Sequence, residues 1–122
     1  MTFQELGLRQ EILDAVAELG FVNPMPVQEQ VIPYMLTHDN DLVALAQTGT
    51  GKTAAFGLPI LNMVNVEQRK IQSLVLAPTR ELCIQIANDI KNFASKMRGV
   101  KVVPVYGGES IVVQYKQLDI QP

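Results

Sequence analysis

The stretch AQTGTGKT, which begins at Ala46, constrains the fold of this chain more than any other part of the sequence. A strand that leads through a glycine-rich loop into a helix is the setting of a phosphate-binding loop, whose usual pattern is G-x-x-x-x-G-K-[ST]. Gly51, Lys52 and Thr53 match three of its four fixed positions, and Ala46 stands at the first glycine position. The apolar run directly before the loop predicts a strand at 42–46.

The residue types in this loop suit a nucleoside triphosphate. Glycines let successive backbone N–H groups converge on an anion, and the start of the next helix adds partial positive charge. We expect Lys52 to neutralise the β- and γ-phosphates and the Thr53 hydroxyl to bind Mg²⁺, which makes them the two catalytic candidates. The predicted nucleotide-binding residues of the loop are Ala46, Gln47, Thr48, Gly49, Thr50, Gly51, Lys52 and Thr53.

Strand and helix patterns alternate after the loop. Alternation of this kind predicts βαβ units and a parallel sheet, with ligands bound beyond the carboxyl ends of the strands. The fold class is therefore α/β, with about three strands and flanking helices. The predicted strands are 42–46, 73–77 and 101–105, and the predicted helices that follow them are 52–65, 80–96 and 110–118.

Two helices are predicted before the loop. Apolar residues recur at helical spacing over 5–19, and Gly20 ends this helix. A rigid proline turn follows, and Pro26 can open the second helix because the first helical position needs no N–H group. Pro33 makes the middle of the second helix irregular.

Composition narrows the class of protein. The chain has 122 residues and a formal net charge of -2, so bulk charge does not indicate a nucleic-acid binder and any such contact must be local. The single Cys83 excludes an internal disulfide framework and fits a reducing compartment. We find neither a signal peptide nor an apolar stretch that could cross a bilayer, so we expect a cytoplasmic chain without a membrane partner.

The sequence of the turn before the second helix indicates which base the bound nucleotide carries. Nothing in the chain matches the Asn-Lys-x-Asp element of GTPases, whereas GFVNPMPVQ, from Gly20 to Gln28, resembles the Q motif of DEAD-box RNA helicases. A glutamine amide offers a donor and an acceptor in one plane, matching adenine N6 and N7. Phe21 could stack on the purine. The resemblance implies ATP as the cofactor, bound also by Phe3, Phe21, Pro26 and Gln28.

Two later stretches extend the resemblance. APTREL, from Ala77, is similar to the motif of that family that contacts the RNA backbone, and YGG, from Tyr106, resembles its double-glycine element. We expect Thr79 to cap the following helix and Arg80 to form an anion site with the first turn. The resemblance implies an RNA site, independent of sequence, at Pro78, Thr79, Arg80, Glu81, Gly107 and Gly108.

The resemblance implies a three-layer RecA-like first helicase domain that is incomplete. Residues 1–36 match the helical Q-motif region and residues 41–122 part of the phosphate-loop α/β core. Met25 replaces the usual Thr or Ser of the Q motif, which removes a loop hydrogen bond. The acidic Asp-Glu-Ala-Asp strand and the second domain do not occur in this sequence.

Three consequences are expected. The parent protein is an RNA helicase, whereas this chain binds nucleotide without hydrolysing it efficiently. Its partners are RNA and the remainder of the helicase core. Open sheet edges favour self-association or marginal stability.

Two other functions remain open. One is a nucleotide- or RNA-binding module without catalysis, which functions as it stands. The other is a P-loop kinase or unrelated NTPase. A kinase is disfavoured because the segment from Glu67 to Gln72 contains only Arg69 and Lys70 and is no arginine-rich lid.

Overall fold

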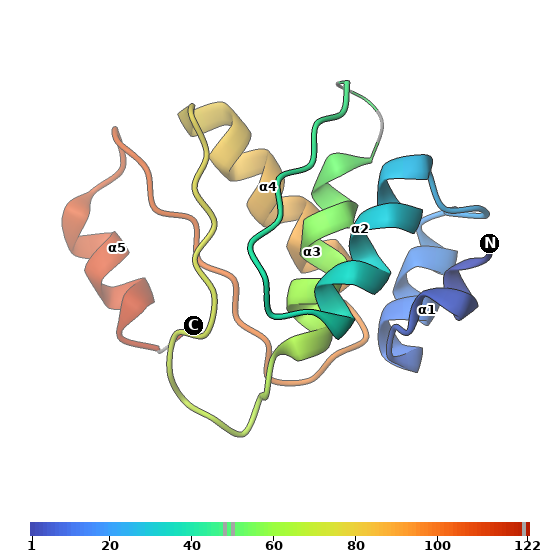
Figure 1. Ribbon diagram of the computed structural model, residues 1–122. Helices are drawn as coiled ribbons and strands as arrows, with labels where there is room; N and C mark the ends of the chain where they lie inside the picture. The colour runs from blue at the N-terminus through green and yellow to red at the C-terminus, as the bar shows by residue number, and fades with distance from the viewer. Residues whose placement is uncertain (48, 50, 121) are drawn as a thin grey trace.

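Helices dominate the computed structural model, which describes residues 1–47, 49, 51–120 and 122 (Figure 1). Their order matches the predicted order along the chain. They are the 3₁₀ helix η1 (Phe3–Leu6) and the α-helices α1 (Gln10–Glu18), α2 (Pro26–Thr37), α3 (Lys52–Met63), α4 (Arg80–Phe93) and α5 (Ile111–Leu118).

Local chemistry explains where two of these helices begin and where one ends. Pro26 occupies the first turn of α2, as predicted. Thr79 caps α4, because its hydroxyl oxygen accepts the Leu82 N–H at 3.1 Å. The predicted helix at 5–19 is wrong as a single element, since Gly7 takes a left-handed φ of 94° and separates η1 from α1.

The core lies where α1, α3 and α4 pack together and α2 packs on α3. Helices α1 to α4 each contribute buried apolar residues, and Ile12, Ile32 and Leu58 are fully buried. Val75, Ala77 and Val102 pack against this cluster from the extended segments. Two of the segments that were predicted to be strands, 73–77 and 101–105, therefore do pack against the helices.

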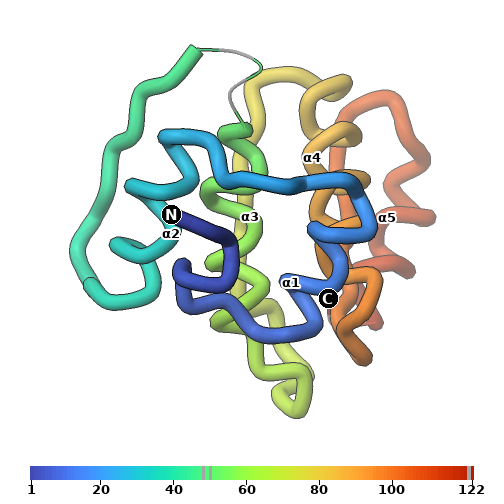
Figure 2. The backbone as a smooth tube through the Cα atoms, turned by 90° about the vertical axis from the view of Figure 1, so that its right-hand side faces the viewer, coloured from blue at the N-terminus to red at the C-terminus, as the bar shows by residue number. Residues whose placement is uncertain are grey.

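The predicted sheet is not formed. None of residues 1–47, 49, 51–120 and 122 lies in a β-strand, and the segments 42–46, 73–77 and 101–105 are extended chain without a ladder. Strands pair only when neighbours run about 4.8 Å apart. In Figure 2 the segment 42–47 runs at the edge of the molecule, away from 73–77, so it has no extended neighbour there.

The segment 74–77 still alternates like a strand. Val75 and Ala77 face the helical core, whereas Leu74 and Leu76 are 81% and 85% exposed. Residues 42–45 do not alternate, because all four are exposed, Val43 to 85% and Leu45 to 93%. A complete three-layer arrangement is therefore not formed by the described residues.

No helix in the described part of the chain has the length and apolarity needed to cross a membrane.

Candidate functional site

The phosphate loop ends in a backbone shape that glycine favours. Gly49 and Gly51 have φ angles of 79° and 81°, in the left-handed region. α3 begins directly after Gly51, carries Lys52 in its first turn and has neither an acidic residue there nor a side-chain cap. Its first N–H groups and its dipole therefore suit an anion. Thr48 and Thr50, which were predicted to bind nucleotide, lie outside the described residues.

Gln28 joins the proline turn to the phosphate loop. Its side chain is 2% exposed, and its Oε1 accepts the Met25 N–H at 2.9 Å. Its Nε2 donates to the carbonyl oxygen of Gly51 at 3.2 Å. A Cβ atom at position 51 would lie 2.3 Å from this Nε2, so the contact requires glycine. The predicted base-binding residue thus contacts the predicted phosphate-binding loop directly.

The predicted aromatic residues form a trio at the edge of the core. Phe21 is half-buried and lies between Phe3, at a centroid distance of 6.1 Å, and Phe93, at 6.0 Å. Phe3 is buried and therefore supports the ring of Phe21 from within. Pro26 is exposed at the start of α2. Base stacking by Phe21 stays a prediction.

Four more residues predicted to bind nucleotide lie around the start of α3: Ala46 and Gln47 before it, and Lys52 and Thr53 in its first turn. Ala46 and Thr53 are partly buried, and Gln47 and Lys52 are exposed. Among the described residues no group of three or more His, Cys, Asp or Glu could hold a metal ion. The role of Thr53 as a ligand of Mg²⁺ stays a prediction.

The two predicted RNA-binding stretches meet. Arg80, at the start of α4, donates from Nη1 to the carbonyl oxygen of Gly107 at 3.5 Å. Gly108 has a φ of 89°, and a Cβ atom there would lie 2.6 Å from the same Nη1. Pro78 and Thr79 are exposed and directly precede α4. Two loops that lie 27 positions apart in the sequence therefore meet at one polar edge.

Glu81 modifies the charge of this edge. Its carboxylate pairs with Arg80 at 3.5 Å. A hydrogen bond to its own backbone N–H, followed by the charge of Arg80, lowers the pKa of Glu81 from its ordinary value. At neutral pH this carboxylate is ionised and offsets part of the guanidinium charge that a phosphate would meet.

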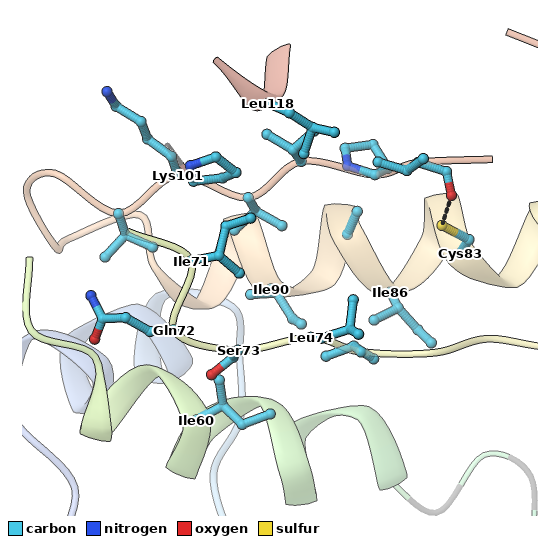
Figure 3. A pocket seen from close by; sticks show the side chains of 18 of the residues that line it. Ile60, Ile71, Gln72, Ser73, Leu74, Cys83, Ile86, Ile90, Lys101 and Leu118 are labelled. Atoms are coloured by element: carbon cyan, nitrogen blue, oxygen red, sulfur yellow. Dashed lines mark hydrogen bonds between the residues drawn. The ribbon is translucent and has the colours of Figure 1, made fainter. Parts of the chain in front are cut away.

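A cavity of about 750 Å³ lies between α4, α5 and the segments 71–79 and 99–107 (Figure 3). Of the predicted nucleotide-binding residues that the structure describes, none lines it. Most of the lining residues that Figure 3 labels are apolar, among them Leu74, Ile86 and Leu118. This cavity is the uncovered side of the extended segments. A smaller cavity of about 510 Å³ lies between α2 and the segment 42–47, with Pro26, Ala46 and Gln47 in its wall.

Sequence reasoning missed Gln114, which is 7% exposed on α5 and binds the loop before it. A glutamine inside the apolar pattern IVVQY was the available signal. Helical periodicity does not tell whether such a residue faces solvent or a loop.

The chain matches the family model described as DEAD/DEAH box helicase over residues 25–121. It is 50% identical over 117 residues to the ATP-dependent RNA helicase DeaD of Klebsiella pneumoniae, covering 96% of this chain and 18% of the relative. It is 47% identical over 121 residues to the DEAD-box ATP-dependent RNA helicase CshA of Geobacillus kaustophilus, covering 99% of this chain and 26% of the relative. The chain thus spans about a fifth to a quarter of the length of these relatives.

Solved structures show the same arrangement of the chain. A DEAD box protein from the hyperthermophile Methanococcus jannaschii superposes with a TM-score of 0.91 at 41% identity, over 97% of this chain and 32% of that one. The RNA helicase Prp28 from Chaetomium thermophilum, solved bound to ADP, superposes with a TM-score of 0.83 at 41% identity, over 93% of this chain and 28% of that one. The path of the chain therefore follows these structures although its extended segments are unpaired.

Proposed function

The chain belongs to the DEAD/DEAH box helicase family, and on this premise we propose that it binds an adenine nucleotide and the backbone of RNA. One observation carries the nucleotide part of the proposal. The amide of Gln28 is bonded to the carbonyl oxygen of Gly51 at 3.2 Å, so the residue suited to the base and the loop suited to the phosphates are adjacent.

Gln28 keeps hydrogen-bonding capacity for adenine. A glutamine amide has two N–H donors and two lone pairs, and the contacts with Met25 and Gly51 use one of each. One donor and one acceptor remain for N7 and N6 of adenine. Because the side chain is 2% exposed, base binding requires Gln28 or the turn at Met25 to move outward.

The phosphates are assigned to the start of α3. Lys52 and the uncapped N–H groups of the first turn neutralise them, and Thr53 offers its hydroxyl to Mg²⁺. Bound ATP supplies the phosphoanhydride bond whose cleavage releases free energy. The residues of this chain hold and orient it.

RNA is assigned to the polar edge formed by residues 78–81 and 107–108. Arg80 and the first turn of α4 supply positive charge, and the double glycine leaves the backbone accessible. Such contacts carry no base information. We therefore expect weak, salt-sensitive binding that does not depend on RNA sequence.

We propose that the parent protein is an ATP-dependent RNA helicase, as its relatives are named, with the remaining helicase core as the partner of this segment. The chain itself lacks the acidic pair and the arginines that hydrolysis needs, so it binds ATP without efficient turnover. A cytoplasmic location, with Cys83 reduced, belongs to the same proposal.

Titration of fluorescent ADP and GDP into the 122-residue chain tests the nucleotide part. The wild type is expected to prefer ADP, Lys52→Ala to weaken both nucleotides, and Gln28→Ala to remove the preference. Equal affinity of the wild type for ADP and GDP would contradict adenine recognition. A parallel phosphate-release assay with ATP is expected to show no turnover above the Lys52→Ala background.

A further inference from the structure

Among the described residues, the two buried polar side chains are both glutamines, Gln28 and Gln114. Each uses its amide in the same way, accepting a backbone N–H with Oε1 and donating to a backbone carbonyl with Nε2. Gln28 does so at the nucleotide loop. Gln114 does so at the loop that carries the double glycine.

Gln114 closes the base of that loop. Its Oε1 accepts the Tyr106 N–H at 2.8 Å, and its Nε2 lies 3.5 Å from the carbonyl oxygen of Glu109, to which it donates. Gly107 and Gly108 lie between these two contacts. Both ends of the turn are therefore tied to a single buried side chain on α5, which is 7% exposed.

The turn itself has little else to hold it. Gly107 and Gly108 have no side chains, and two further contacts of the turn are exposed: the Tyr106 hydroxyl donates to Glu109 Oε2 at 3.1 Å, and Arg80 donates to the Gly107 carbonyl oxygen at 3.5 Å. Glycine loses more conformational freedom on ordering than any other residue. An amide that satisfies both ends of the turn offsets part of that loss.

The turn also sets the direction of Arg80, whose Nη1 donates to the carbonyl oxygen of Gly107. Release of the turn would move this carbonyl oxygen and leave the guanidinium with Glu81 as its partner. The effect of Gln114 therefore reaches the charged residue of the edge through the turn, because Gln114 contacts Tyr106 and Glu109 whereas Arg80 contacts Gly107.

We propose that Gln114 is a positioning residue for RNA binding, which holds the turn at 106–109 in the shape that receives a phosphate without contacting RNA itself. The inference rests on the proposed RNA function. A glutamine is required because the site needs a donor and an acceptor in one plane. Leucine supplies neither, and glutamate keeps the acceptor for Tyr106 but loses the donor to Glu109.

The test uses the whole chain with Gln114→Leu and Gln114→Glu. Gln117→Leu is the matched control, because Gln117 lies exposed on the same helix. Fluorescein-labelled oligouridylate measures RNA affinity, fluorescent ADP measures nucleotide affinity, and amide hydrogen exchange measures protection of the Tyr106 N–H. Circular dichroism confirms that each variant is folded.

Gln114→Leu is expected to weaken RNA binding about tenfold, the loss of one well-formed polar contact. ADP affinity should stay within about twofold, and exchange at Tyr106 should accelerate. Gln114→Glu should keep Tyr106 protected, and Gln117→Leu should match the wild type in every measurement.

Unchanged RNA affinity and unchanged Tyr106 protection in Gln114→Leu would overturn the inference. Equal losses of RNA and ADP affinity would also overturn it, because they indicate general loosening of the fold. If the wild type binds no RNA, the proposed RNA function fails instead. Tyr106 exchange would then still decide whether Gln114 holds the turn.

Discussion

Gln28 and Gly51 are joined by a hydrogen bond from the side-chain Nε2 to the backbone carbonyl oxygen, 3.2 Å long. The same carbonyl oxygen accepts the Ala55 N–H at 3.1 Å, in the first turn of α3. The Gln28 side chain and the first turn of α3 therefore share one acceptor.

Gly51→Ala is expected to destabilise the chain more than Gly49→Ala. Both positions are left-handed, which costs an alanine about 1–2 kcal/mol. Only position 51 adds a clash, with Cβ 2.3 Å from Gln28 Nε2, whereas position 49 is open. Urea unfolding measures both free energies of unfolding. Equal losses would show that the Gln28 contact does not restrict position 51.

Gln28→Leu is expected to lower the free energy of unfolding by about 1–2 kcal/mol, because the Met25 N–H loses its acceptor. ADP affinity should fall at the same time. Gln30→Leu, at an exposed position of the same helix, is the control and should leave both unchanged. A Gln28→Leu chain with normal stability and normal preference for ADP would contradict both roles of this amide.

Arg80→Ala is expected to weaken binding of single-stranded RNA and to reduce the slope of log affinity against log salt by about one, because one phosphate contact is lost. The matched control is Arg98→Ala, since Arg98 is exposed beyond the end of α4. Fluorescence anisotropy at several salt concentrations gives both slopes. The prediction fails if Arg98→Ala changes the slope as much as Arg80→Ala.

The lowered pKa of Glu81, caused first by the hydrogen bond from its own backbone N–H and then by the charge of Arg80, predicts that stability depends on acid. Its folded-state pKa lies below the ordinary value of 4.5, so the carboxylate contributes stability above that value and loses the contribution as pH falls through the lowered pKa. Glu81→Gln should therefore unfold with a shallower decrease of stability below about pH 4.5. Thermal melts across pH 3–7 (about one melt per half unit) compare it with the wild type. Identical acid profiles would exclude the contribution.

Self-association is expected through the bare side of the extended segments. Leu74 and Leu76 are more than four-fifths exposed, and their backbone has no strand neighbour. Leu74→Lys with Leu76→Lys should shift sedimentation toward monomer. Val22→Lys, at an equally exposed site between α1 and α2, should not. A wild type that sediments as a monomer at about 100 μM, a concentration at which exposed strand edges aggregate, would refute the prediction.

Local signals predicted the helices and the capped start of α4 well. Proline position, apolar spacing and the Thr79 cap act within a few residues, so the sequence is sufficient to read them. The split between η1 and α1 was missed because Gly7 interrupts a spacing that otherwise continues through it. Thr48 and Thr50 lie outside the described residues, and the ligand roles of the loop stay predictions.

The pairing of the predicted strands could not be predicted from the sequence, for a different reason. The apolar runs predicted strands at 42–46, 73–77 and 101–105. They could not predict pairing, because a strand is defined by a neighbour that an apolar run does not specify. The structure leaves all three segments as unpaired chain.

The sequence by itself determined the order of the helices, the glycine loop before α3 and the residue types that suit phosphate, adenine and RNA. Tertiary structure alone decided the partners of Gln28 and Gln114 and the meeting of Arg80 with Gly107. The physical reason is range. Propensity, capping and periodicity depend on neighbours in the chain, whereas a buried amide finds its donor and acceptor only when distant segments have packed together.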